Sequence, residues 1–347
     1  MRNSSARISA FTRRGPAEAG TPGVILALGM ALAMACAGCS PERNAGTRAD
    51  AQPQAAVEIP PRIWEQFSGA NALKETAEQV EIGPRPSGSA AIAQARTLIT
   101  DSLKKSGWEV ERQEFDLAPV PGQGTIHFVN LIARFSQNGS RPVPRGTQRA
   151  ILGSHYDTKR MDAVRFVGAN DGGSSTGALL ELARVLAKAP ALASRIELVF
   201  FDGEEAVVQF GPAETGPDGL VGSRHYAQVL RDTGRARQFR FGIVWDMIGD
   251  ADLTVTLPRD TPAALASGLF AGAEVLGVRR NFGYSAGDIV DDHTPLHLIA
   301  SISAMDIIDF DYPPWHTSAD TLDKLSAASL QTVGRVTLWL LARDLAK

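Results

Sequence analysis

The sequence predicts an α/β fold, a three-layer sandwich in which helices flank a central, mostly parallel mixed sheet. Segments of strand character alternate with segments of helical character along most of the chain, which is typical of such sheets. The run Ile196–Phe201 is short, apolar and rich in β-branched and aromatic residues, as expected of a buried strand. The 347 residues are 44% apolar and 21% charged, which suits a globular domain with a large core.

Periodicity and turn residues place the expected elements in order. Apolar residues at helical spacing, such as Leu179, Leu182 and Leu186, predict helices over residues 64–80, 90–105, 176–187, 224–230, 263–276 and 325–342. Alternating or continuous apolar runs predict strands over residues 109–115, 125–135, 150–154, 196–201, 241–245 and 296–303. Residues 83–89 are rich in Gly, Pro and Ser and predict a structured loop. No internal repeat is visible, so we expect one domain over residues 61–347.

The N-terminal residues have the features of a targeting segment. Four arginines precede an uncharged apolar run over residues 24–37, which is short for a membrane span and fits a signal-peptide core. Residues 36–40 resemble the bacterial lipoprotein signal, which implies cleavage before Cys39 and acylation of its thiol. Cys36 departs from that signal, which usually has an aliphatic residue there, and a plain secretory signal is the alternative. We therefore expect a signal peptide over residues 1–39 and a flexible linker over residues 40–60.

Charge and cysteine content narrow the classes of function. The net charge of −3 gives no electrostatic reason to expect nucleic acid or an anionic membrane surface as a partner. Both cysteines, Cys36 and Cys39, lie in the targeting segment, so the mature domain has no disulfide and no thiol nucleophile. The expected location is outside the cytoplasm, either periplasmic or membrane-anchored through Cys39, and the only expected membrane contact is that lipid anchor.

Acidic and imidazole side chains follow three predicted strands. These residues are His155, Asp246, and the adjacent pair Glu204 and Glu205, while Asp171 precedes a predicted helix. The carboxyl ends of parallel strands meet at one edge of a sheet, where ligands bind in α/β folds. Clustered carboxylates repel one another, and a cation would offset that repulsion. Mixed Asp, Glu and His ligands with an open position are a known catalytic zinc pattern.

Each of these residues also has a purely structural interpretation. The Glu204–Glu205 pair could be a solvated acidic turn, Asp171 a helix cap, and Asp246 the cap of a turn. A single histidine such as His155 or His316 is more often a hydrogen-bonded structural residue than a ligand. The joint arrangement at one sheet edge favours the metal interpretation. His127, His225 and His297 retain the structural interpretation, with His297 expected inside a strand.

Several motifs together resemble the family-28 zinc metallopeptidases, a superfamily of aminopeptidases and glutaminyl-peptide cyclotransferases. The similarity extends from about residue 82 to the C-terminus, and its motifs occupy residues 153–159, 168–171, 201–206, 222–225 and 315–317. It implies the fold of zinc aminopeptidases, also called phosphorylase/hydrolase-like.

Further details resemble the cyclotransferase branch of that superfamily. Residues 83–89 are similar to its N-terminal loop, 16 residues (206–221) separate Glu205 from the next motif, and residues 291–295 are similar to its acidic motif. Trp315, directly before His316, resembles its substrate-lining tryptophan. The retained His155 and Asp246 are compatible with both branches.

The resemblance to cyclotransferases implies a specific set of roles. One zinc is held by Asp171, Glu205 and His316 and polarises the γ-carbonyl of an N-terminal glutamine. Glu204 moves the proton from the attacking α-amine to the departing ammonia. Asp291 and Asp246 stabilise the reacting groups, and Trp315 packs on the substrate. The expected substrates are the N-termini of peptides and proteins.

Two other functions remain open at this point. In an aminopeptidase, Asp171 would bridge two zincs, with His155 and Asp246 as ligands of the second, and Glu204 would activate a water molecule. In a non-enzymatic binding module of the same fold, metal ligands are typically lost. Every expected ligand position is occupied here, which disfavours that third function.

Overall fold

In the computed structural model of the protein, the described residues are 59–135, 147–210 and 218–345. The expected signal peptide, Cys39 and nearly all of the expected linker lie outside these ranges. The described residues all belong to a single unit of the chain. None of the helices in these ranges has the length and hydropathy needed to cross a bilayer.

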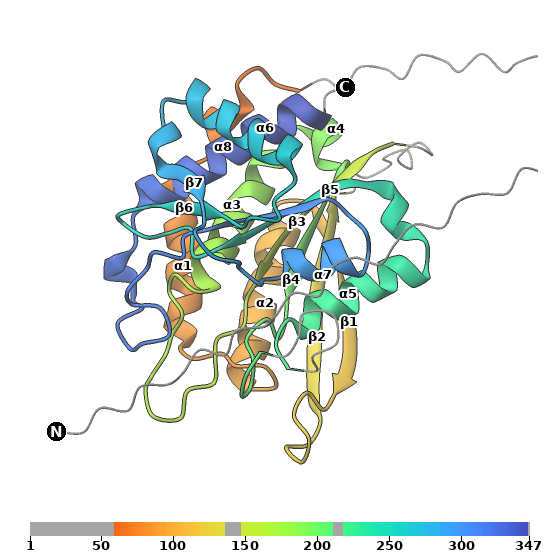
Figure 1. Ribbon diagram of the computed structural model, residues 1–347, viewed down its shortest axis with the longest axis vertical. Helices are drawn as coiled ribbons and strands as arrows, with labels where there is room; N and C mark the ends of the chain where they lie inside the picture. The colour runs from red at the N-terminus through yellow and green to blue at the C-terminus, as the bar shows by residue number, and fades with distance from the viewer. Residues whose placement is uncertain (1–58, 136–146, 211–217, 346–347) are drawn as a thin grey trace, which may run out of the picture. The chain divides into compact units, whose positions relative to one another are not determined.

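A central sheet runs through the described domain (Figure 1). Within the described ranges its strand order is β1-β2-β4-β3-β5-β8. The strands are β1 (Trp108–Leu117), β2 (Ile126–Phe135), β3 (Arg149–His155), β4 (Ile196–Phe201), β5 (Phe239–Asp246) and β8 (Ala304–Ile308). Strands β4, β3, β5 and β8 are parallel, and the antiparallel pair β1–β2 joins the sheet alongside β4. The carboxyl ends of the four parallel strands therefore share one edge.

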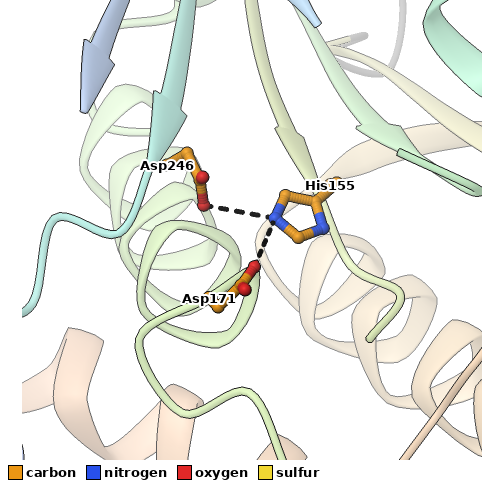
Figure 2. A group of neighbouring side chains, drawn as sticks. All are labelled: His155, Asp171 and Asp246. Carbon is orange, nitrogen blue, oxygen red and sulfur yellow. Dashed lines mark hydrogen bonds and ion pairs between the residues drawn. The ribbon is translucent and has the colours of Figure 1, made fainter. Parts of the chain in front are cut away.

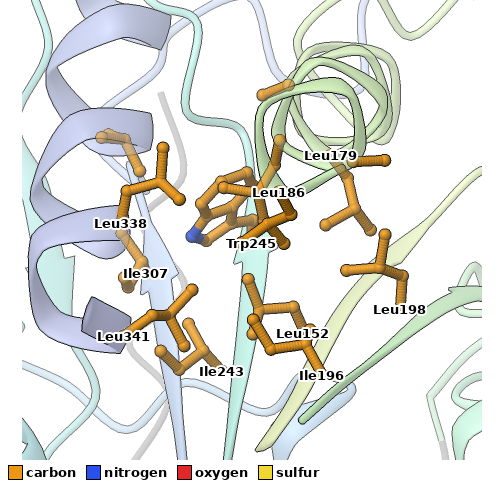
Figure 3. Close-up of a cluster of buried hydrophobic side chains, with 14 of the residues drawn as sticks. Leu152, Leu179, Leu186, Ile196, Leu198, Ile243, Trp245, Ile307, Leu338 and Leu341 are labelled. Carbon is orange, nitrogen blue, oxygen red and sulfur yellow. The ribbon is translucent and has the colours of Figure 1, made fainter. Parts of the chain in front are cut away.

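Helices cover both faces of this sheet because its buried strands are apolar on both sides. One face packs against the group α1 (Gly69–Ile82), α2 (Ala90–Lys105), α3 (Gly173–Leu186), α4 (Pro190–Ala193), α6 (Ala263–Val275) and α8 (Ala327–Leu345). The other packs against α5 (Val221–Asp232) and α7 (His293–Leu298). Leu152 of β3 belongs to the same buried cluster as Leu179 and Leu338 (Figure 3), whereas its neighbour Ile151 belongs to the cluster of Tyr226 on the opposite face. The predicted three-layer α/β sandwich is confirmed.

Helices α1 and α3 approach each other closely at a glycine. A Cβ atom on Gly177 of α3 would lie 2.3 Å from Oγ1 of Thr76 and 2.7 Å from the carbonyl oxygen of Ala72, both in α1. This contact holds α1 against the helix that begins just after Asp171.

One expected element is wrong. Residues 296–303 do not form a strand: His293–Leu298 form helix α7, and the strand begins only at Ala304. His297 therefore lies in a helix and is exposed, not inside a strand. The apolar run is short, and periodicity alone cannot distinguish a short buried helix from a short buried strand. The structure also has a small parallel pair that the sequence did not predict, β6 (Val255–Leu257) with β7 (Phe282–Tyr284).

Candidate active site

The shared edge of the parallel strands brings the predicted functional residues together. His155 is the last residue of β3, Asp246 is the last residue of β5, and Glu204 and Glu205 follow β4. Asp171 lies in the loop before α3. Each of these five side chains is less than a tenth exposed.

Two groups of metal-ligand type share Asp171. In the first, Nε2 of His155 lies 3.2 Å from Oδ1 of Asp171 and 3.2 Å from Oδ1 of Asp246 (Figure 2). In the second, Nε2 of His316 lies 3.0 Å from Oε1 of Glu205 and 3.3 Å from Oδ2 of Asp171. His316 adopts φ of +53°, which is uncommon for a residue other than glycine. The surrounding loop thus holds its imidazole in a sparsely populated backbone conformation.

The surroundings shift the pKa values of these groups in different directions. Burial raises the pKa of Glu204 well above its ordinary 4.5, and the charge of Glu205 acts in the same direction. Burial would lower the pKa of His316, but its two carboxylate neighbours raise it to about 9. Burial would raise the pKa of Asp171, but His155 and His316 hold it below 3.8. Asp171 therefore stays ionised, while Glu204 has the proton affinity expected of a base.

A cavity of about 290 Å³ opens onto these side chains. Glu204, Asp246 and Asp291 contribute carboxylates to its wall. The apolar part of the wall consists of Phe210, Ile289, Val290, Ile308, Phe310 and Trp315. Asp291, to which the resemblance gives a role in the site, lines the cavity, whereas its neighbour Asp292 is fully buried and does not.

Trp315 forms part of an aromatic group at the cavity. Its indole stacks on the imidazole of His316 at 4.1 Å and lies 5.0 Å from the ring of Phe310, measured between ring centroids. Trp315 remains 39% exposed, so an apolar face is available to a bound molecule.

Two buried aspartates for which the sequence predicts no role support the site through the backbone. Asp157 accepts hydrogen bonds from the amides of Glu204 (3.2 Å) and Glu205 (3.3 Å). Asp320 accepts hydrogen bonds from the amides of Asn170 (2.8 Å) and Asp171 (3.2 Å). Asp157 lies within the motif at residues 153–159, but contacts with backbone amides leave no pattern in a sequence.

Arg85 supports the same region from the N-terminal loop. Its fully buried guanidinium donates to the carbonyl oxygens of Tyr156 (3.0 Å), Val167 (2.7 Å) and Gly168 (3.1 Å). One side chain therefore joins the segment after β3 to the segment that leads to Asp171. The sequence predicts a structured loop over residues 83–89, but no sequence pattern indicates this contact.

The three remaining histidines of interest lie away from the cavity wall. His127 contacts Asp116 on the neighbouring strand at 2.9 Å. His225 stacks on Phe115 at 3.8 Å between ring centroids, and His297 is exposed on α7.

The donor set fits a zinc ion. Carboxylate and imidazole ligands in groups of three leave a position open for water or substrate. The atoms of each group lie within 4.8 Å of one another. In addition, the buried Oδ2 of Asp171 accepts no hydrogen bond and has an ion-pair contact with Nε2 of His316 at 3.3 Å instead. The cost of leaving such groups unsatisfied is relieved when a metal binds to the cluster.

A family model supports an assignment for the chain. The description of that model is Peptidase family M28, and it matches residues 130–341. The chain belongs to peptidase family M28.

Individual relatives place this M28 protein in the glutaminyl cyclase branch. A glutaminyl-peptide cyclotransferase of Drosophila melanogaster is 34% identical over 185 residues, which are 52% of this chain and 48% of the fly protein. The match thus spans about half the length of that relative. The crystal structure of Acidobacteriales bacterium glutaminyl cyclase is 30% identical with a TM-score of 0.70, covering 84% of this chain and 98% of that chain.

A solved exopeptidase has a similar fold. The structure of a Zn-dependent exopeptidase from Parabacteroides distasonis is 26% identical with a TM-score of 0.68, covering 80% of this chain and 98% of that chain. The fold of this M28 protein is therefore shared by a solved glutaminyl cyclase and a solved Zn-dependent exopeptidase.

Proposed function

We propose that the protein is a zinc-dependent glutaminyl-peptide cyclotransferase, which converts the N-terminal glutamine of peptides or proteins to pyroglutamate and releases ammonia. One observation carries the proposal: Glu204 and Asp291 line the same cavity as the group Asp171, Glu205 and His316. The match to glutaminyl cyclases over 98% of one solved chain supports this choice within the family.

Asp171, Glu205 and His316 would hold one zinc ion. When bound there, the ion supplies Lewis-acid polarisation of the substrate γ-carbonyl. Lys159 lies beside this group, with Nζ 3.3 Å from Oε2 of Glu205 and 3.1 Å from the carbonyl oxygen of Ala206. It thereby fixes the orientation of the Glu205 carboxylate.

Glu204 acts as the proton carrier. Its carboxylate accepts a proton from the α-amine as the amine nitrogen attacks the γ-carbonyl carbon, and it returns a proton to the departing ammonia. The raised pKa of this buried carboxyl makes its carboxylate a stronger base for the first half of the transfer. Because amine and carbonyl belong to one residue, holding the folded conformer close to the ring geometry contributes much of the rate gain.

The remaining cavity residues bind and orient the substrate. Asp291 and Asp246 are positioned to accept hydrogen bonds from the α-amino group and the γ-amide of the substrate, which both carry N–H groups. Trp315 and Phe310 present apolar surface for the methylene groups of the glutamine side chain.

A pair of peptides tests the proposal. The purified protein is incubated with one peptide beginning with Gln and one beginning with Leu, and both are followed by mass spectrometry while bound zinc is quantified. Loss of ammonia from the Gln peptide, with the Leu peptide intact, supports the cyclotransferase. Release of free leucine would instead assign an aminopeptidase.

The second candidate function, a two-zinc aminopeptidase, is favoured by the group His155, Asp171 and Asp246. These residues would hold the second metal, and Glu204 would take a proton from water. No activity on either peptide, with zinc bound, would favour a binding module over both enzymes.

We also propose that the protein is exported and anchored to a membrane by acylated Cys39. The apolar run over residues 24–37 and the sequence around Cys39 support this proposal. Replacing Cys39 by Ala should release the protein from the membrane fraction. Membrane retention of that variant would contradict the anchor.

A further inference from the structure

The segment that follows Glu205 is fastened by one carboxylate. Asp218 is buried, and its Oδ1 accepts a hydrogen bond from the amide of Val207 at 2.7 Å. Its Oδ2 accepts from the amides of Val208 at 2.8 Å and Gln209 at 2.9 Å. Three consecutive amides therefore share one anion, and hydrogen bonds to a charged acceptor are stronger than neutral ones.

The segment that Asp218 binds is exposed, so packing in the protein interior does not hold it in place. Val208 is 61% exposed, and no helix or strand includes residues 207–210. An exposed segment outside regular structure normally has mobile amides. The carboxylate of Asp218 thus supplies the order that packing does not.

The hydrogen bonds of Asp218 also join the two ends of the loop that begins after Glu204. Two backbone hydrogen bonds lie next to them: the amide of Leu220 donates to the carbonyl oxygen of Glu204 (2.8 Å), and that of Val221 donates to Gly203 (2.7 Å). Asp218 therefore adds a side-chain clamp to a loop base that begins at Glu204. Residues 211–217 lie outside the described ranges.

The clamp fixes Phe210, which lines the cavity. Phe210 follows the third bonded amide directly, and its ring packs over Gly219, the residue after Asp218. A Cβ atom on Gly219 would lie 2.6 Å from Cδ1 of Phe210, and Gly219 has φ of +75°. Asp218 and Gly219 together thus define where the ring can lie.

The position of Phe210 has a consequence for peptides. Glu204, Asp246 and Asp291 are buried, whereas Asp288 and several apolar residues form the exposed part of the cavity wall, so the rest of a bound peptide leaves past these exposed residues. Phe210, Val290 and Phe310 are 37%, 49% and 47% exposed and belong to this wall.

We propose that Asp218 is a positioning residue that holds Phe210 against the second residue of the substrate, and that the enzyme therefore favours peptides with an apolar second residue. This proposal rests on the cyclotransferase function. Asp218 contacts no reacting group itself and acts through Phe210.

A double-mutant cycle tests the proposal. The variants Asp218→Ala, Phe210→Ala and the combination are assayed on peptides beginning Gln-Phe and Gln-Gly, with Asp116→Ala as a control because Asp116 is exposed on β1. Asp218→Ala should raise KM for the Gln-Phe peptide about tenfold. Its kcat and zinc content should stay within about twofold of wild type, and the preference for Gln-Phe should fall.

The combination distinguishes action through Phe210 from an independent effect. The double variant should match Phe210→Ala within about twofold, since the clamp has no purpose once the ring is absent. Effects that multiply, or a loss of kcat with unchanged KM, would overturn the proposal. Asp218→Asn, which keeps one acceptor oxygen, should fall between wild type and Asp218→Ala.

Hydrogen exchange resolved to single amides gives a second test that needs no activity. In the wild type, the amides of Val207, Val208 and Gln209 should exchange at least about tenfold more slowly than those of unbonded exposed loops. Asp218→Asn should remove part of this protection, whereas Gly219→Ala should keep it while displacing Phe210 and raising KM. Unprotected amides in the wild type would overturn the clamp. A protected wild type that cyclises no Gln peptide would instead refute the proposed function.

Discussion

Nε2 of His316 lies 3.0 Å from Oε1 of Glu205, although the two residues are 111 positions apart. The contact joins the loop after β8 to the loop after β4, and Asp171 lies on its other side at 3.3 Å from the same nitrogen. Such a junction can form only once the parallel strands are in register. The candidate zinc site is therefore a property of the assembled sheet.

Substitution of the proposed base should separate chemistry from metal binding. We expect Glu204→Gln to lower turnover of a Gln peptide by a factor of about 10² to 10⁴, because the amide cannot accept the proton. Zinc content, measured by metal analysis, should be unchanged. Glu114→Gln is the control, because Glu114 lies on the edge strand β1 and does not line the cavity. Surviving activity in Glu204→Gln would mean that another group is the base.

The two histidines of the site should differ in their effect on zinc. His316→Gln should weaken zinc binding by more than about 100-fold, since it removes a proposed ligand. His155→Gln should leave one zinc per chain, because the proposed single ion does not use that residue. Zinc competition with a chelator, together with metal counting, measures both. A fall from two zincs to one in His155→Gln would favour the aminopeptidase.

Asp309 should make stability depend on pH. Burial raises the pKa of this carboxyl to about 7, while its hydrogen bonds with the amides of Thr254 and Asp311 only partly oppose the shift. A raised pKa in the folded state stabilises the protein below pH 4, and this contribution is lost as the pH rises towards 7. The amide of the Asp309→Asn variant cannot ionise, so this variant does not lose stability in this way as the pH rises. Relative to wild type, its free energy of unfolding should improve by about 1–2 kcal/mol between pH 4.5 and 7.5.

Urea unfolding at several pH values measures the slope for Asp309. The substitution also changes one hydrogen-bond acceptor into a donor, which adds an offset that does not vary with pH. The test is therefore how the difference in free energy of unfolding between Asp309→Asn and wild type changes with pH. A constant difference between the two proteins would contradict the prediction.

Gly177→Ala should destabilise the fold although alanine favours helices. Helix propensity predicts a gain of about 0.5–1 kcal/mol for such a change. The added methyl group would instead meet Thr76 at 2.3 Å and force α1 and α3 apart, at a cost of about 1–3 kcal/mol. Gly287→Ala is the matched control, because no atom lies within 4 Å of its added Cβ. Thermal unfolding should show a lower Tm than wild type for Gly177→Ala but not for Gly287→Ala.

Periodic and strongly apolar segments were predictable from the sequence. The boundaries of Ile196–Phe201 and Ala90–Lys105 agree with the predicted residues, because each begins and ends at clear turn or capping residues. Residues 296–303 were not predictable in this way. Leu296 packs on β5 as part of the short helix α7, and these tertiary contacts, not the local apolar pattern, determine that the segment is helical.

The site residues that directly follow the ends of parallel strands could be predicted from the sequence. His155, Asp246, Glu204 and Glu205 meet because parallel strands share an edge. Their supports were not predictable, since Asp157 and Asp320 bind backbone amides, which any sequence supplies. The clamp by Asp218 is of the same kind.

The three carbonyl bonds of Arg85 bear on where the functional unit starts. The family model matches from residue 130, yet this guanidinium, 45 residues earlier, joins two loops of the site. A fragment cut at the start of that match would lack α1, α2 and β1 as well as this cross-link. The match of the family model therefore covers a shorter stretch than the one that must be expressed or transplanted as a whole.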